Sequence, residues 1–226
     1  MTEHHPYSPV GDSADRRDYL PAAGLHALLP GYDLLTRLLG MRKNYDNLVA
    51  QAELVDGLRV LEIGCGTGNV TILAKRRQPG AELVGIDPDP KALARAQRKA
   101  LGLTGIHFDR GYAQSLPFAD GEFDRVLSSM MLHHLDDETK AAAAAEVFRV
   151  LRPGGRLHIL DVGGHMTAAD GFAARRMLGN AHAAGNLGDA IPRLLVDAGF
   201  DCREVATQRH RFIGRLTFYC ATRPGA

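Results

Sequence analysis

The chain has 226 residues, of which 45% are hydrophobic and 23% are charged, and its formal net charge is +1. This length and composition suit one folded domain with a full hydrophobic core, and the near-neutral charge argues against a long nucleic acid as partner. Three cysteines without paired spacing argue against a disulfide framework or a zinc site. No apolar run is long enough for a membrane span and no signal peptide opens the sequence, so we expect a cytoplasmic protein without a bound metal.

The N-terminal part divides into two segments. Residues 1–17 are polar and rich in Pro, Gly and Asp, which predicts a flexible end. From Leu20 to Leu54 apolar residues recur at helical spacing, with a break at Pro30-Gly31. We therefore expect residues 18–54 to form two or more helices before the first strand.

A buried strand, a glycine-rich loop and a helix follow one another between residues 60 and 78. The apolar run ends in three glycines at alternate positions, which are Gly64, Gly66 and Gly68. Glycine permits positive φ, and without a Cβ it lets a ligand lie against the backbone. A dinucleotide fingerprint would place a glycine where Asn69 stands, and the acidic Glu62 before the loop suits a cationic ligand better than a pyrophosphate.

Strands and helices alternate through the rest of the core. A second apolar strand ends at Asp87, whose carboxylate can accept hydrogen bonds from both hydroxyls of a ribose. Asp89-Pro90 is typical of a helix start, and this helix should end near Ala100. The later expected elements are a strand over 106–109, a strand over 123–129, a helix over 137–150 capped by Asp136, and a strand over 156–162 after a Pro-Gly-Gly turn. Alternation of this kind predicts a parallel sheet with helices on both faces.

The last quarter of the chain predicts a helical stretch followed by a hairpin. Residues 168–198 are expected to be helical, with an interruption at 185–188. Asp201 to Gln208 and Arg211 to Ala221 read as two strands joined by a short turn, so they should be antiparallel to each other.

Five motifs in order resemble those of the class I S-adenosylmethionine-dependent methyltransferases. They are LEIGCGTG at 61–68, VGID at 84–87, GYAQSLPF at 111–118, FDRVLSS with LHHL over 123–135, and LRPGG at 151–155. A further segment, YDLLTRLL at 32–39, is similar to the lead-in of the small-molecule and quinone-biosynthesis group. The resemblance implies an α/β fold with a Rossmann-like, doubly wound, seven-stranded and mostly parallel sheet that carries a C-terminal antiparallel hairpin. It also implies one domain over 18–226, with a helical lid over 18–54 and a core over 55–226.

The resemblance implies S-adenosyl-L-methionine as cofactor and S-adenosyl-L-homocysteine as product. Asp87 would take the ribose, and the loop around Ala113 would lie beside the adenine, although Tyr112 replaces the usual aspartate there. Glu62 would orient the glycine loop or accept from the α-ammonium, and a purely structural carboxylate is the alternative. The expected cofactor-binding residues are Glu62, Gly64, Gly66, Thr67, Gly68, Asp87, Pro88, Tyr112, Ala113, Gln114 and Ser129.

The catalytic residues are less defined by the sequence. Methyl transfer from a sulfonium is an in-line displacement that positioning accelerates, and good orientation alone can supply ~7–11 kcal/mol. His134 in the LHHL motif and His165 after the fifth strand are candidates for a general base, and a packing role is the alternative for each. The basic clusters at 75–77 and 95–99 have helical spacing and are expected to be solvated helix faces.

The acceptor is expected to be a moderately apolar small molecule with an O, N or C nucleophile. Its identity stays open, as does the choice between a monomer and a homodimer. Nucleic acid methylation is disfavoured because Ser128-Ser129-Met130-Met131 stands where an Asn/Asp-Pro-Pro-aromatic motif would be. The alternatives are a non-catalytic cofactor-binding regulatory module, an aminopropyltransferase and a nicotinamide-dependent dehydrogenase.

Overall fold

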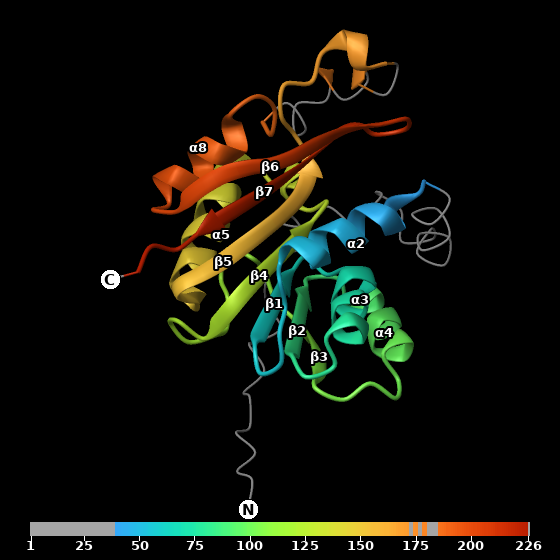
Figure 1. Cartoon of the computed structure of the whole chain (residues 1–226), viewed down its shortest axis with the longest axis vertical. Coiled ribbons are helices and arrows are strands. Elements are labelled where there is room, and N and C mark those ends of the chain that lie inside the picture. Colours follow the sequence, from blue (N-terminus) through green and yellow to red (C-terminus); the bar gives the residue numbers. More distant parts are fainter. Residues whose placement is uncertain (1–38, 172–173, 176–177, 180–184, 226) are drawn as a thin grey trace, which may run out of the picture.

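The computed structural model describes residues 39–171, 174–175, 178–179 and 185–225. Its centre is a seven-stranded sheet in the order β3-β2-β1-β4-β5-β7-β6, in which β7 runs antiparallel to both of its neighbours (Figure 1). The strands are β1 (Arg59–Ile63), β2 (Glu82–Asp87), β3 (Ile106–Arg110), β4 (Phe123–Ser129), β5 (Leu151–Val162), β6 (Asp201–His210) and β7 (Gly214–Thr222). The predicted mostly parallel sheet with a C-terminal antiparallel hairpin is confirmed.

Helices cover both faces of this sheet (Figure 1). On one face lie α2 (Met41–Gln51), α3 (Asn69–Arg77) and α4 (Pro90–Lys99), and on the other lie α5 (Asp137–Val150) and α8 (Ala190–Asp197). Two short 3-10 turns, η3 (Leu132–His134) and η4 (Ala168–Asp170), follow β4 and β5. Asp89 and Asp136 cap α4 and α5 by accepting from backbone amides, as their positions in the sequence predict.

Two sequence-based boundaries differ from the structure. Strand β5 begins at Leu151 rather than Arg156, because Leu151 already pairs with Phe123 ahead of a bulge, so the Pro-Gly-Gly segment lies inside the strand. Strand β7 begins at Gly214 rather than Arg211, because residues 211–213 form the hairpin turn. The expected N-terminal helices over 18–38 and the flexible end over 1–17 lie outside the described residues.

Each face of the sheet has its own hydrophobic core. Phe123, Leu151 and Tyr219 are fully buried under α5 and α8, whereas Leu48 and Phe218 are buried on the face that α2 covers. Burial of such side chains stabilises the fold by roughly 1.5–3 kcal/mol each. Helix α2 therefore packs on the sheet as part of the core, and the proposed division of the chain into a lid and a core stays a prediction.

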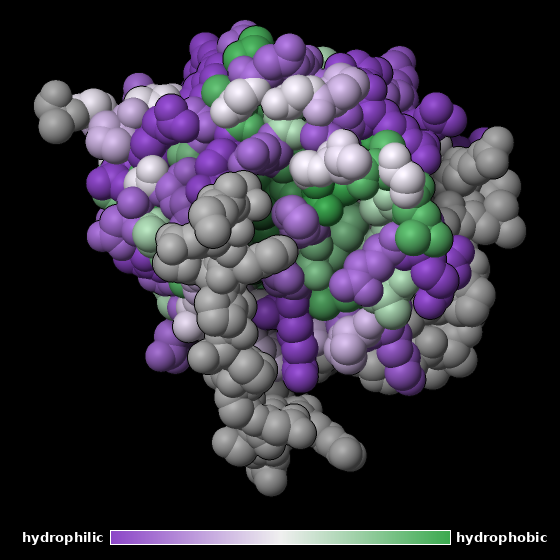
Figure 2. Space-filling model, turned by 90° about the horizontal axis from the view of Figure 1, so that it is seen from below, coloured by the Kyte–Doolittle hydropathy of each residue, from purple (hydrophilic) through white to green (hydrophobic). Residues whose placement is uncertain are grey.

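One face of the molecule is mainly hydrophilic (Figure 2). Figure 2 shows a face on which hydrophilic residues surround hydrophobic ones that gather in a hollow near its centre. Of the helices that the structure describes, none combines the length and the apolar character needed to cross a membrane.

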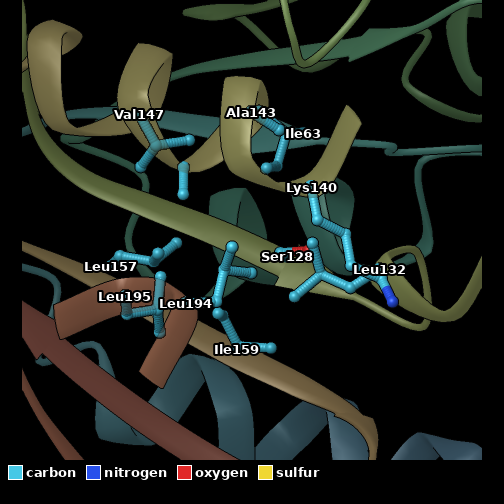
Figure 3. Close-up of a pocket in the computed structure, with 11 residues that line it drawn as sticks. Ile63, Ser128, Leu132, Lys140, Ala143, Val147, Leu157, Ile159, Leu194 and Leu195 are labelled. Atoms are coloured by element: carbon cyan, nitrogen blue, oxygen red, sulfur yellow. The ribbon is translucent and has the colours of Figure 1, made fainter. Parts of the chain in front are cut away.

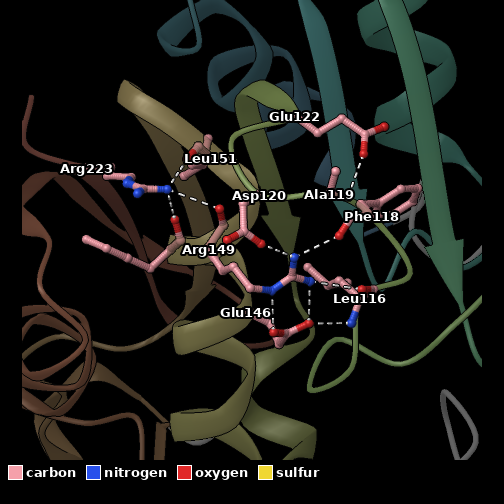
Figure 4. Close-up of polar contacts among 10 residues, drawn as sticks. Leu116, Phe118, Ala119, Asp120, Glu122, Glu146, Arg149, Leu151 and Arg223 are labelled. Carbon is pink, nitrogen blue, oxygen red and sulfur yellow. Dashed lines mark hydrogen bonds and ion pairs between the residues drawn. The ribbon is translucent and has the colours of Figure 1, made fainter.

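An arginine near the end of α5 holds the loop that connects β3 to β4 (Figure 4). The guanidinium of Arg149 donates to the carbonyls of Leu116 and Phe118 at 3.0 and 2.8 Å, and it pairs with Glu146 at 2.8 Å. The amide of Leu116 in turn donates to Glu146 at 2.7 Å. The hydrogen bond from Arg149 lowers the pKa of Glu146, so this pair stays charged at neutral pH.

We expect Arg149→Ala to lower the free energy of unfolding by about 1–3 kcal/mol, because it removes charged hydrogen bonds and leaves two loop carbonyls without them. Arg98→Ala is the matched control: Arg98 is exposed and also lies in the last turn of its helix, so the helix-dipole contribution is comparable. The control should change the free energy by less than about 0.5 kcal/mol. Urea unfolding measures both, and equal losses would contradict this role of Arg149.

Candidate functional site

The order of the strands reverses next to β1. The chain runs from β1 to β2 and β3 on one side and then crosses back to β4 on the other side. We call the space at the carboxyl ends of β1 and β4, with the loops around it, the crevice. In open α/β sheets the carboxyl ends of such a strand pair bind ligands. The loops after β1, β2, β4 and β5 all lie at this edge.

The three glycines of the loop after β1 have different surroundings. All three have left-handed φ angles, of 65° at Gly64, 53° at Gly66 and 75° at Gly68. A Cβ at Gly68 would lie 2.9 Å from side-chain atoms of Ala96 and Phe108, so this glycine allows α3 to pack closely. A Cβ at Gly66 would meet no atom within 4 Å, so the backbone there faces open space. A ligand therefore has access to the backbone at Gly66.

The carboxylate of Asp87 holds this loop. The Gly66 amide donates to its Oδ2 at 2.8 Å, and the Asp89 amide donates to its Oδ1 at 2.9 Å. The residue is 8% exposed, and burial raises its pKa although both amides oppose that shift. Because each carboxylate oxygen can accept two hydrogen bonds, both oxygens keep capacity for a ligand hydroxyl.

The predicted adenine loop lies next to Asp87. The Gly111 amide donates to the Asp87 carbonyl at 3.3 Å, and the Ser115 amide closes a turn on the Tyr112 carbonyl at 3.1 Å. Tyr112, Ala113 and Gln114 in this turn are half-buried, as is Pro88 after Asp87. The structure thus brings the VGID and GYAQSLPF motifs together, as the resemblance implies.

Glu62 lies buried beneath the glycine loop. Its carboxylate accepts a hydrogen bond from the Thr71 hydroxyl on α3. Burial raises the pKa of Glu62 to about 8, with a further rise from the negative charge of Asp87, so the group is mostly protonated at neutral pH. A positively charged ligand group nearby would favour its ionised form.

Two lysines that the sequence analysis expected on solvated helix faces bond the backbone instead. Lys99 on α4 donates to the Thr67 carbonyl at 2.9 Å and to Asn69 at 2.6 Å. Lys75 is buried and donates to the Pro79 carbonyl at 2.7 Å. The expectation was wrong for both, because a long lysine side chain can bury its stem and bring the ammonium to carbonyls of another segment.

The end of β4 lies against the glycine loop. Met130 adopts a left-handed φ of 55°, which is unusual for a residue with a side chain. This turn places the side chain of Met131 over Gly64, where a Cβ would lie 2.9 Å from that of Met131. The hydroxyl of Ser129 is buried and has no hydrogen-bond partner among the described residues. Buried hydroxyls are normally bonded, so Ser129 fits a site that a polar ligand group completes.

A buried acid at the end of β5 was missed by the sequence analysis. Asp161 is fully buried, and it accepts from the amides of Met131 and Leu132 at 3.1 and 2.8 Å and contacts His133 Nδ1 at 2.6 Å. Burial lowers the pKa of His133, but the charge and hydrogen bond of Asp161 outweigh that effect and raise it overall. An acid that directly follows the apolar pair Ile159-Leu160 near the end of the strand is the signal that could have revealed it.

The two histidines proposed as general bases have different positions. The ring of His134 lies beside that of His133, with 4.0 Å between centroids. His165 has a side chain that is 77% exposed, and its Nε2 lies 3.5 Å from Asp189. The structure therefore places His134 next to His133, which contacts the buried Asp161, and it places His165 on the surface.

A separate small pocket lies inside the core between the sheet, α5 and α8 (Figure 3). It is lined mainly by aliphatic side chains such as Val147, Leu157 and Leu195, with Ser128 and Lys140 as its polar members. Most of these residues belong to the hydrophobic core, so the pocket is a gap in packing. Within the described part of the chain, no group of three His, Cys, Asp or Glu residues is arranged to hold a metal ion.

Comparison with known proteins finds methyltransferases among the relatives. Residues 60–155 match a protein-family model described as a methyltransferase domain. The chain is 40% identical over 143 residues to a demethylmenaquinone methyltransferase of Thermus thermophilus, covering 59% of this chain and 62% of that protein. It is 36% identical over 157 residues to the protein of the same name from Deinococcus radiodurans, covering 68% and 64%. The match thus spans less than two thirds of the length of these relatives.

Solved structures agree with the fold. YcgJ from Bacillus subtilis has a TM-score of 0.66 at 18% identity, covering 80% of this chain and 98% of that one. An S-adenosylmethionine-dependent methyltransferase from Methanosarcina mazei has a TM-score of 0.64 at 21% identity, covering 79% and 98%. The family model, the fold, the motifs gathered at its crevice and the sequence relatives all support a protein of the class I S-adenosylmethionine-dependent methyltransferase type.

Proposed function

We propose that this protein transfers a methyl group from S-adenosyl-L-methionine to a small-molecule acceptor by in-line displacement at an O, N or C nucleophile. The observation that supports this most is the contact between Gly66 and Asp87. It holds an open backbone position and a carboxylate with spare acceptor capacity together at the crevice. When bound, the cofactor supplies an electrophilic methyl group on a sulfonium.

We assign the cofactor contacts residue by residue. Asp87 accepts from the ribose hydroxyls, with Pro88 beside them, and the backbone of Gly64, Gly66 and Gly68 follows the ribose and methionine portions. The turn formed by Tyr112, Ala113 and Gln114 holds the adenine. Glu62, Thr67 and Ser129 are assigned to the methionine end, where Glu62 complements positive charge. In the methyl transfer, the residues of the protein position the two reactants and exclude water.

The acceptor is proposed to be moderately apolar. The names of the relatives support a quinone-like ring, whereas structural neighbours include a phosphoethanolamine N-methyltransferase and a geranyl diphosphate methyltransferase, so the fold does not select an acceptor. We place the reaction in the cytoplasm, and either a monomer or a homodimer satisfies the proposal. A non-catalytic regulatory module would bind the same cofactor without transferring its methyl group.

Isothermal titration with S-adenosylmethionine and S-adenosylhomocysteine tests the cofactor site. We expect both to bind and Asp87→Ala to weaken them at least tenfold, or about 1.4 kcal/mol, because the ribose hydroxyls lose their acceptor. The control is Asp109→Ala, since Asp109 is an exposed acid at the end of the neighbouring strand β3. Thermal melts verify folding. Absence of binding to the folded wild type, or binding of NAD in its place, would refute the proposal.

Glu62→Gln should have opposite effects on the stability of the fold and on the affinity for the cofactor. The folded-state pKa of about 8 lies above the ordinary value of 4.5, so the wild type loses stability as pH rises through this window, whereas the glutamine variant does not. We expect the variant to gain about 2–4 kcal/mol relative to wild type between pH 5 and pH 8, and to bind S-adenosylmethionine at least tenfold more weakly.

Urea unfolding at both pH values and titration at pH 8 measure the two effects of Glu62→Gln. Glu82→Gln, which changes an exposed acid at the start of β2, is the control and should alter neither quantity. If the Glu62→Gln variant kept full cofactor affinity, Glu62 would be a structural residue only.

A further inference from the structure

We propose that His133, oriented by Asp161, accepts the proton of a hydroxyl group on an aromatic ring of the methyl acceptor. This inference rests on the proposed function and adds a catalytic base, a positioning residue and a class of acceptor to it. It selects His133 rather than His134 or His165.

The first argument is how Asp161 is held. Its carboxylate is fully buried, and amides of Met131, Leu132 and Val162 donate to it at 3.1, 2.8 and 2.7 Å. These amides fix the carboxylate and supply only donors, so its remaining acceptor capacity is directed at the imidazole. A carboxylate held this way orients a histidine ring strongly.

The second argument is the turn that brings His133 to the crevice. Met130 stands in the left-handed region at a cost of about 1 kcal/mol, and Met131 covers Gly64 of the cofactor loop. Strained residues of this kind concentrate at functional sites. The turn places His133 at the same edge of the sheet as Gly64 and Asp87.

The third argument is the state of the imidazole. Because an ionised carboxylate only accepts hydrogen bonds, Nδ1 of His133 carries the proton that binds Asp161 at 2.6 Å, which leaves the lone pair on Nε2. No described residue is hydrogen-bonded to Nε2, and 14% of the side chain is exposed. The ring therefore keeps an accessible basic nitrogen.

The charges around His133 favour proton uptake. Asp161 on β5 stabilises the imidazolium, whereas Lys140 on α5 opposes it, and the ring of His134 lies alongside. Asp161 prevails and raises the pKa of His133 above its ordinary value of 6.5. A neutral imidazole can accept the proton of a ring hydroxyl, whereas an aliphatic alcohol is far less acidic and a neutral amine attacks without prior loss of a proton.

The proposed step balances as follows. The O–H bond of the acceptor breaks, and its proton forms a bond to Nε2 of His133. The electron pair left on the oxygen forms the new O–CH₃ bond. The S–CH₃ bond breaks with its electron pair on sulfur, which leaves a neutral thioether, and the imidazolium beside Asp161 later returns its proton to water.

The other two histidines lack this arrangement. The imidazole that Asp161 contacts is that of His133, whereas His134 is the next residue of the same 3-10 turn and is exposed. His165 is largely exposed beside the exposed Asp189. His134→Gln is thus a matched control, since it changes the adjacent residue of the same 3-10 turn and leaves the Asp161 contact in place.

The first test needs no turnover. In ¹⁵N-histidine NMR titrations of the full chain, we expect one imidazole with a pKa above 6.5 whose signals vanish in His133→Gln. That pKa should fall in Asp161→Asn, and the wild-type shifts should identify Nδ1 as the protonated nitrogen. A pKa of His133 below 6.5, or a neutral His133 that is protonated on Nε2, would overturn the proposal.

The second test follows transfer of labelled methyl from S-adenosylmethionine to 1-naphthol and to the more acidic 4-nitrophenol, both at saturating cofactor. We expect His133→Gln to lower kcat for 1-naphthol by about 10²–10⁴-fold and to change kcat for 4-nitrophenol, which is ionised at pH 8, less than tenfold. Cofactor affinity should stay within twofold. His134→Gln should lose less than tenfold with either phenol.

The pH profile distinguishes catalysis from a structural role. The wild-type kcat for 1-naphthol should rise with pH through the His133 pKa and level off, and Asp161→Asn should move the rise to lower pH. Because Asp161→Asn also weakens three amide contacts, the His133→Gln result stands as the independent test. Equal losses with both phenols, a larger loss in His134→Gln, or no transfer to either phenol by a chain that binds the cofactor would overturn the inference. Failure to bind the cofactor would instead refute the proposed function.

Discussion

The site depends on the hydrogen bond between the Gly66 amide and the Asp87 carboxylate. Strands β1 and β2 are parallel and are connected through α3. No tight turn therefore holds the loop after β1 against the end of β2. The ladder extends one step past β1, from the Cys65 amide to the Ile86 carbonyl at 2.9 Å, and the Asp87 side chain continues it to Gly66. Left-handed φ angles at Gly64, Gly66 and Gly68 then become necessary, because other residues would each cost about 1–2 kcal/mol there.

Three of the buried carboxylates at this edge, Asp161, Asp87 and Glu62, are stabilised to different degrees. Asp161 accepts from three amides and contacts an imidazole, Asp87 accepts from two amides, and Glu62 accepts from the hydroxyl and the amide of Thr71. Burying an acid with few donors destabilises the folded state, and the raised pKa of Glu62 expresses that cost. Acids kept at such a cost are typical of functional sites. Asp161 at β5 is therefore a carboxylate fixed by its hydrogen bonds, whereas the charge of Glu62 at β1 depends on the ligand that binds beside it.

The sequence predicts what depends on local pattern. Strand β4 coincides with the FDRVLSS motif, and Asp89 was identified as the N-cap of α4, because motifs and caps act within a few positions. The start of β7 was misplaced, since pairing with β5 and β6 decides it. Lys99 and Asp161 act on residues 32 and 28 positions away, at Thr67 and His133, and no local pattern encodes such contacts. The motifs therefore predicted the loops of the site, whereas the side chains that hold them became visible only in the fold.

Under the proposed function, the crevice divides into a side that binds the methyl donor and a side that binds the acceptor. The family match covers residues 60–155 and so contains every proposed cofactor contact, whereas Asp161 lies beyond it. The family match therefore supports the proposed contacts with the methyl donor more than those with the acceptor. The acceptor side is built where β4 and β5 end, from a strained turn at Met130 and the buried acid beneath it. That strain is sustained because Asp161 bonds the two amides that follow Met130, so the same carboxylate shapes the turn and orients the imidazole that we assign to the acceptor.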